Sequence, residues 1–144
     1  MFKDALPSDS VGLQFWTVYT RWHSEVLKIL KPLNINHTQF VILASILWCK
    51  ENQKRSTQAE IVCITGLDKM ALSKSLKSLV SRALIMKDKN ILDSRSFLLK
   101  LSPNGEVLTK TALMLIEQLD QQYFSRLKHR KTLFISLLQE IRDE

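Results

Sequence analysis

Turn-forming residues are scarce in this sequence, which contains only three glycines and three prolines among its 144 residues. An all-β sandwich needs a turn about every ten residues and draws heavily on these two residue types. Hydrophobic residues make up 45% of the chain and charged residues 24%, which is typical of a folded globular domain. We therefore expect one domain over residues 1–144 that is mainly α-helical.

Apolar residues recur at three- and four-residue steps through the first third of the chain. A stripe of aromatic and aliphatic side chains predicts a long amphipathic helix within residues 8–32, and such a stripe usually faces a core or a subunit interface. Asn36 and Gln39 form a capping-box pattern at the start of a second helix over about 37–50. The apolar residues of this helix cover too wide an arc for a surface helix, so we expect it to be central.

Two shorter helices follow, joined by a tight turn. Thr57 and Glu60 form another capping box, and Gly66 fits the positive φ that ends many helices. Asp68 then caps the next helix, in which Leu72 and two later leucines recur on one side. Two short helices joined by a turn containing glycine are typical of a helix-turn-helix unit.

The side of this last helix opposite the leucines carries three lysines, a serine and a methionine, with no carboxylate between them. Lysine donates to guanine O6 and N7 or to phosphate, serine donates or accepts at base edges, and methionine can touch a thymine methyl group. This face therefore suits the major groove of DNA. Its residues are Lys69, Met70, Ser73, Lys74 and Lys77.

The positive charge of the chain is concentrated in one block. The formal net charge is +7, and residues 68–100 hold eight basic and three acidic side chains, a net charge of +5. A local basic patch can be a surface that binds a polyanion. The alternative is a charged face that is simply solvated. The residues within the block therefore decide between these two interpretations.

A small β-hairpin is expected after the helix-turn-helix. Residues 85–87 and 96–101 have β-type patterns on either side of the polar segment 88–94. Ser102 followed by Pro103 predicts the start of another helix. From there the helical pattern continues to Ile141, with a break or bend expected at residues 121–123.

Taken in order, these elements resemble the MarR family of winged helix-turn-helix transcriptional regulators over nearly the whole chain. The fragments that carry the resemblance are INHTQFVIL at 35–43, TQAEI at 57–61, LDKMALSKSLKSL at 67–79, ALI at 83–85, DSR at 93–95 and LSPNG at 101–105. The resemblance implies a DNA-binding part over about 36–101, with the helices within 8–32 and 103–142 forming a homodimer. A two-fold dimer of this kind would bind a pseudo-palindromic operator in double-stranded DNA, with half-sites about 10 bp apart.

The resemblance also assigns roles within the hairpin, or wing. Arg95 matches the arginine that such proteins place in the minor groove, and Asp93 matches the aspartate that steadies the wing loop through a salt bridge. Lys87 and Lys89 complete the basic wing. The alternative for Arg95 is a surface arginine that pairs with Asp93 and contacts nothing else.

The sequence favours a regulator but leaves its mode of regulation open. One hypothesis is a repressor released by a small aromatic effector; Trp16, Tyr19, His23 and Trp48 are candidate pocket residues, although they also suit an ordinary core. The second is a DNA-bound regulator that needs no ligand. The third is a winged-helix adaptor that binds proteins, which would have no need for lysines on the recognition face.

Other classes of function lack support in the sequence. No catalytic motif occurs, and the three histidines lack the ligand spacing of a zinc site, so we expect no enzyme activity, metal or cofactor. Cys49 and Cys63 lie in apolar stretches and are predicted to be buried, reduced thiols. No apolar segment approaches the ~20 residues that cross a bilayer, so we expect a cytoplasmic protein with no membrane partner.

Overall fold

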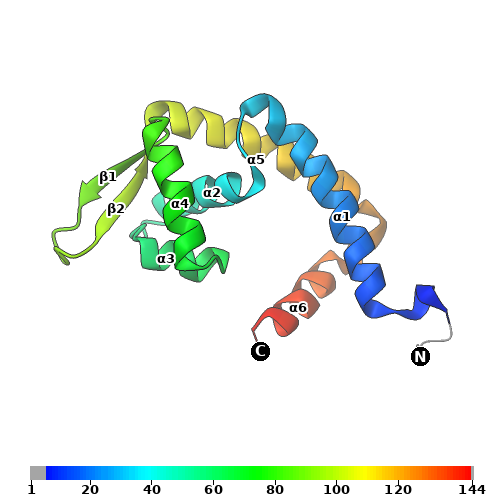
Figure 1. Cartoon of the computed structure of the whole chain (residues 1–144). Coiled ribbons are helices and arrows are strands. Elements are labelled where there is room, and N and C mark those ends of the chain that lie inside the picture. The colour runs from blue at the N-terminus through cyan, green and yellow to red at the C-terminus, as the bar shows by residue number, and fades with distance from the viewer. Residues whose placement is uncertain (1–5, 144) are drawn as a thin grey trace.

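The computed structural model describes residues 6–143 and consists of helices with one two-stranded antiparallel hairpin (Figure 1). The outermost residues of the domain expected over 1–144 lie outside this range. The elements in chain order are η1 (Pro7–Asp9), α1 (Val11–Leu30), η2 (Lys31–Leu33), α2 (His37–Glu51), α3 (Gln58–Thr65), α4 (Lys69–Ser81), β1 (Ile85–Lys89), β2 (Phe97–Leu101), α5 (Pro103–Tyr123), η3 (Ser125–Arg130) and α6 (Lys131–Arg142).

A polar side chain caps the first turn of each of the helices α1 to α5, at the residues that the sequence predicted. In the capping box of α2, Gln39 N donates to Asn36 Oδ1 at 2.8 Å and Asn36 N donates to Gln39 Oε1 at 3.0 Å. Each cap satisfies a backbone donor that the first helical turn leaves without a partner. The capping residues are Ser10 for α1, Asn36 for α2, Thr57 for α3, Asp68 for α4 and Ser102 for α5.

Helix α2 lies at the centre of the core, as expected from its wide apolar arc. Ile42, Leu43 and Cys49 are fully buried, and α2 packs against α1, α3, α4, α5 and β2. Figure 1 shows α3, α4 and the hairpin on one side of the molecule and α1 with α6 on the other, while α5 extends from one group to the other. The core therefore holds the helix-turn-helix and the hairpin to one end of α5.

A close backbone contact joins the end of α4, the start of β1 and the start of α5. Ser102 N donates to Leu84 O at 3.0 Å, and Ser102 Oγ donates to Ala83 O at 2.6 Å. Gly105 in the first turn of α5 lies directly against Leu84, where a Cβ on the glycine would stand 2.0 Å from the Leu84 carbonyl oxygen. Only glycine allows this approach, which explains the glycine of the LSPNG fragment.

The end of α4 forms a Schellman motif. Ala83 N donates to Val80 O and Leu84 N donates to Leu79 O, each at 3.0 Å, while Ala83 adopts φ 56°. An alanine in this left-handed conformation is strained by about 1–2 kcal/mol, so the surrounding contacts must hold the turn in place. Those contacts are the two hydrogen bonds from Ser102 described above.

The break expected at residues 121–123 coincides with the end of α5 at Tyr123. Tyr123 Oη donates to Val18 O of α1 at 3.1 Å and anchors this last turn. A second departure from helical geometry follows at Lys128, with φ 52° and ψ −123°, before α6 begins. The sequence did not predict this second bend.

An aromatic and histidine cluster joins α1 to α2 and α5. His23 Nδ1 of α1 and His37 Nδ1 of α2 are 2.9 Å apart, a hydrogen bond in which one ring donates and the other accepts. Trp22 Nε1 donates to Asp120 Oδ1 of α5 at 2.8 Å, and the rings of Tyr19 and His23 are stacked with centroids 5.3 Å apart. This cluster ties the long first helix to the centre of the molecule.

We expect the Gly105→Ala variant to lose about 3 kcal/mol or more of unfolding free energy, because its Cβ would collide with rigid backbone at Leu84. Gly12→Ala is the matched control: Gly12 lies in the exposed first turn of α1, and the nearest atom to its added Cβ is Ser10 Oγ at 4.0 Å. That control should be neutral or slightly stabilising. Urea unfolding followed by circular dichroism measures both, and equal stabilities would contradict the contact.

We also expect stability to fall on acidification because of His37. Burial, and after it the charge of His23, holds the pKa of His37 below its ordinary value of 6.5, against a weaker opposing effect of Asp120. Below pH 6.5 the unfolded chain therefore binds a proton at His37 more readily than the folded one does, so the free energy of unfolding decreases as the pH falls through this window.

The test compares unfolding in urea at pH 7.5 and 5.5 for the unaltered protein and two variants. His37→Gln should reduce the loss of stability, since glutamine does not titrate, whereas His129→Gln, at an exposed position, should leave it unchanged. An equal loss in all three proteins would contradict the assignment to His37.

Candidate nucleic-acid interface

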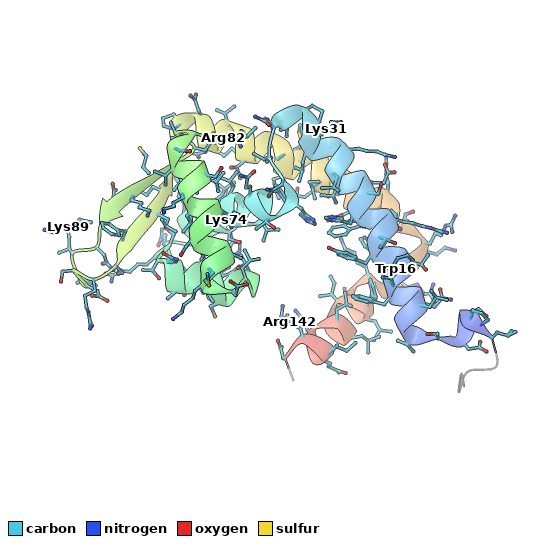
Figure 2. The ribbon with its side chains drawn as sticks, viewed as in Figure 1. Trp16, Lys31, Lys74, Arg82, Lys89 and Arg142 are labelled. Atoms are coloured by element: carbon cyan, nitrogen blue, oxygen red, sulfur yellow. The ribbon has the colours of Figure 1, made fainter. Side chains whose placement is uncertain are left out.

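Helix α4 is anchored on one side and open on the other. Leu72, Leu76 and Leu79 are buried in the core, and Asp68 Oδ1 accepts from Ala71 N at 2.8 Å to cap the helix. Figure 2 shows α4 along the front of the molecule, with the side chain of Lys74 labelled on it. All five residues selected from the sequence are exposed: Lys69, Met70, Ser73, Lys74 and Lys77.

The turn before α4 sets the direction in which this face points. Gly66 adopts φ 71°, as expected, and a Cβ there would meet nothing within 4 Å, so its conformation and not its size requires glycine. Leu67 N donates to Thr65 Oγ1 at 3.2 Å within the same turn. Gln39 Nε2 of α2 lies 3.4 Å from Ser78 Oγ and connects the middle of α4 to the central helix.

A residue that the sequence did not single out also reaches the exposed face. Gln58 Nε2, in the first turn of α3, donates to Ser73 Oγ at 2.7 Å. This contact orients the hydroxyl group of Ser73 and places an amide beside it. Only the fold reveals the pairing, because the two residues are separated by a turn whose geometry no local pattern specifies.

The hairpin stands beside α4 and is joined to the helix-turn-helix at its base. Its strands pair in antiparallel register from Ile85 with Leu101 to Lys89 with Phe97. Leu99 N donates to Ser56 O at 2.8 Å, and Thr57 forms an isolated bridge with Leu98. The segment before α3 thus acts as a third, very short strand, which the sequence did not predict.

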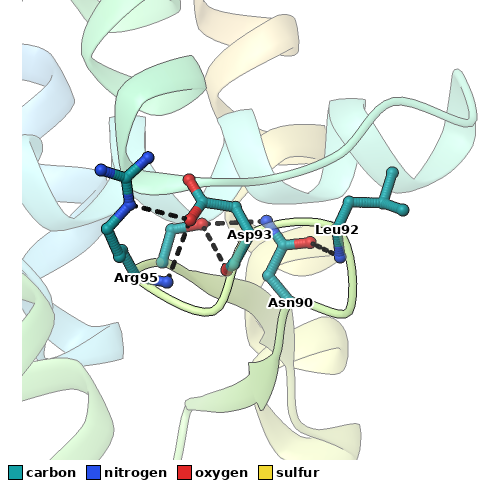
Figure 3. Close-up of polar contacts among 5 residues, drawn as sticks. Asn90, Leu92, Asp93 and Arg95 are labelled. Carbon is teal, nitrogen blue, oxygen red and sulfur yellow. Dashed lines mark hydrogen bonds and ion pairs between the residues drawn. The ribbon is translucent and has the colours of Figure 1, made fainter.

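The tip of the hairpin is held by a network of hydrogen bonds (Figure 3). Asn90 is buried; its Nδ2 donates to Ser96 Oγ at 2.9 Å, and its Oδ1 accepts from Leu92 N at 3.2 Å. Asp93 Oδ1 accepts from Arg95 N at 3.0 Å. The same oxygen lies 3.4 Å from Arg95 Nε, in a pair whose arginine side chain is 91% exposed. Such a pair contributes at most about 1 kcal/mol, so Arg95 is free to exchange it for a phosphate.

The acidic side chains of residues 68–100 leave most lysines of this segment without an ion-pair partner. Asp68 caps α4, Asp88 lies 2.7 Å from Lys100, and Asp93 stays within the tip. Within residues 6–143, five lysines of this segment have no carboxylate within ion-pair distance: Lys69, Lys74, Lys77, Lys87 and Lys89. The electropositive surface expected from the charge distribution is therefore not neutralised by neighbouring acids.

The four residues suggested as an effector pocket do not form one cluster. Tyr19 and His23 are stacked on each other, but Trp16 is exposed to solvent on α1. Trp48 lies on α2 with Lys54 Nζ 5.0 Å from its ring centroid. The cluster instead includes Trp22 and His37, which the sequence pattern did not select.

The two cysteines differ in their exposure to solvent. Cys49 is buried, as expected, and burial raises the pKa of its thiol. Cys63 is exposed, so the prediction that it is buried was wrong. Helix α3 has eight residues, of which only Ile61 is buried, and the side that carries Cys63 points to solvent.

Residues 6–143 show no feature of a metal site or of a membrane-spanning helix. Their histidine, cysteine, aspartate and glutamate side chains nowhere gather in a group of three or more that could hold a metal ion. None of their helices combines the length and the apolar character needed to cross a membrane.

Similarity to known proteins agrees with this geometry. The profile of the ArnR1-like winged-helix domain family matches residues 31–120. The chain is 30% identical over 135 residues to YdcH of Bacillus subtilis (strain 168), an uncharacterised HTH-type transcriptional regulator; the match covers 94% of this chain and 91% of that protein.

Solved structures show the same fold. BpsR of Bordetella bronchiseptica, whose DNA binding is regulated by 6-hydroxynicotinic acid, has a TM-score of 0.83 at 22% identity, covering 98% of this chain and 99% of that one. A mutant of MarR from E. coli complexed with operator DNA has a TM-score of 0.76 at 24% identity, covering 96% and 97%. The chain therefore belongs to the ArnR1-like winged-helix domain family of HTH-type transcriptional regulators, and it has the fold seen in MarR.

Proposed function

We propose that the protein binds a pseudo-palindromic operator as a homodimer and represses transcription there. The observation that carries this proposal is the exposed face of α4, whose lysines lack acidic partners while its opposite face is buried. In this arrangement α4 lies in the major groove and the hairpin lies over the adjacent minor groove. Because the target is DNA, we place the action of the protein in the cytoplasm.

The residues of the interface divide between positioning and base recognition. Lys69, Lys74 and Lys77 supply positive charge to phosphates or guanine edges, and Met70 supplies an apolar contact for a thymine methyl group. Ser73, oriented by Gln58, supplies a hydroxyl group at a fixed position. In the wing, Arg95 enters the minor groove while Lys87 and Lys89 neutralise the flanking phosphates.

A second copy of the chain explains the apolar surface of the terminal helices. Every described side chain of α6 is at least partly accessible, and Phe15 and Trp16 of α1 are exposed. An apolar groove of about 670 Å³ lies between α1 and α6, lined by Phe15, Leu137 and Ile141 among others. A monomer rarely exposes so much contiguous apolar surface, which supports a two-fold interface formed by these helices.

A small aromatic effector would act best at the cluster between α1 and α2. Of the four suggested pocket residues, Tyr19 and His23 lie in this cluster beside Trp22 and His37. Regulation of BpsR by 6-hydroxynicotinic acid supports an effector of this chemical class. A ligand that separated His23 from His37 would alter how α1 packs on α2. It would therefore change the spacing of the two recognition helices in the dimer.

We expect Arg95→Ala, Lys74→Ala and Lys77→Ala to weaken binding to an operator duplex. Each phosphate contact that is lost should reduce the slope of log affinity against log salt by about one. Lys28→Ala is the matched control, since it removes the same charge from an exposed ion pair with Glu25 on α1. Fluorescence anisotropy at several salt concentrations measures both quantities. Unchanged binding in the three interface variants would contradict the proposed placement.

The dimer gives a separate test. We expect sedimentation to give a mass of about twice the 16.7 kDa of one chain at micromolar concentration. Leu137→Glu places a charge in the α1–α6 groove and should shift the protein toward monomer, with weaker operator binding. Val107→Glu changes an exposed apolar side chain of α5 outside the residues that line the groove, and should remain dimeric. A monomeric unaltered protein would refute the interface.

A further inference from the structure

The tip of the wing presents two large apolar side chains to solvent. Ile91 is 93% exposed, the highest value of any large apolar side chain in residues 6–143, and its neighbour Leu92 is 70% exposed. Loop tips of soluble proteins are usually polar, because exposed apolar area is unfavourable in water. An isoleucine and a leucine side by side at the tip therefore indicate a surface that binds a partner.

The loop is built so that these side chains point outward. Its polar groups are turned inward: Asn90 bonds to Ser96 and to Leu92 N, Asp93 N donates to Asn90 O at 3.3 Å, and Ser96 N donates to Asp93 O at 3.2 Å. Figure 3 shows the Leu92 side chain directed away from this polar network, on the opposite side of the loop from the Arg95 guanidinium. The apolar end is thus presented by an ordered loop.

The charges around the tip indicate what it contacts. Lys89 and Arg95 flank the pair on either side in the chain, and the carboxylates of Asp88 and Asp93 are engaged with Lys100 and with the loop itself. A purely apolar protein surface would leave these cations without a counter-charge. The minor groove of DNA combines both features, since phosphates line its rims while the sugars and base edges inside offer apolar carbon surface.

We propose that Ile91 and Leu92 enter the minor groove with the tip of the wing, on the other side of the loop from Arg95, and pack against the deoxyribose walls. This inference rests on the proposed function and adds an apolar contribution to a wing that otherwise acts through charge. Because burial of apolar surface releases no counterions, the tip should raise affinity without changing the salt dependence. That behaviour distinguishes it from the lysines and from Arg95.

The experiment uses the full-length protein and a duplex selected with it from a random double-stranded library. Ile91→Ser and Leu92→Ser should each lower the affinity about tenfold, with the slope of log affinity against log salt unchanged. Met86→Ser, which removes a half-exposed apolar side chain from β1 away from the tip, is the matched control and should bind like the unaltered protein. Circular dichroism verifies that the variants are folded.

Hydroxyl-radical cleavage, which reports the accessibility of the sugars, locates the contact. The double variant Ile91→Ser/Leu92→Ser should lose sugar protection in the minor groove next to each half-site, while methylation protection of guanine N7 in the major groove is retained. An unchanged footprint and affinity within twofold of the unaltered protein would overturn the inference and indicate a protein partner for the tip. If the unaltered protein selects no duplex at all, the proposed function itself fails, and this inference fails with it.

Discussion

The contact between Gly105 and the carbonyl group of Leu84 fixes the position of α5 relative to α4 and the hairpin. On one side of it lie the end of α4 and the start of β1, and on the other lies the first turn of α5. Ser102 strengthens the same point by capping α5 and by bonding to Ala83 and Leu84. A bulkier residue at position 105 would push α5 away and would change how both the recognition helix and the wing are presented.

Helix α2 extends this constraint to the rest of the core by packing against most of the other α-helices and strands. Its buried face contacts α3, α4 and β2 of the helix-turn-helix and wing as well as α1 and α5. Three buried leucines hold α4 against the apolar side chains of the core. The polar face of α4 therefore does not have to contribute to stability. The lysines of that face can therefore be selected for binding alone, and the absence of neighbouring acids leaves them unpaired.

The sequence predicted features that depend on local chemistry and missed those that depend on distant residues. Caps such as Asn36 and Asp68 act within one turn, so their residue types suffice to place helix starts. The exposure of Cys63 was missed because α3 is too short for periodicity to identify its buried side. The Gln58–Ser73 bond, the Ser56–Leu99 pairing and the His23–His37 contact join separate elements, and no spacing in the chain encodes them. The wing residues Asp93 and Arg95 were located by family resemblance and not by periodicity.

Helix α5 links the DNA-facing part to the terminal helices as a single rigid segment. Its first turn is fixed against Leu84. In its last turn, Asp120 accepts a hydrogen bond from Trp22 of α1, and Tyr123 donates to Val18 O. If two chains associate through α1 and α6, the distance between their recognition helices is then determined by the length of α5 and by the seat of α1 upon it. The His23–His37 hydrogen bond lies at that seat, where α1 also meets α2. Under the proposed function, a small displacement there would be transmitted along two anchored helices, and a ligand bound at the cluster would change the separation of the two recognition helices without touching the proposed DNA-binding residues.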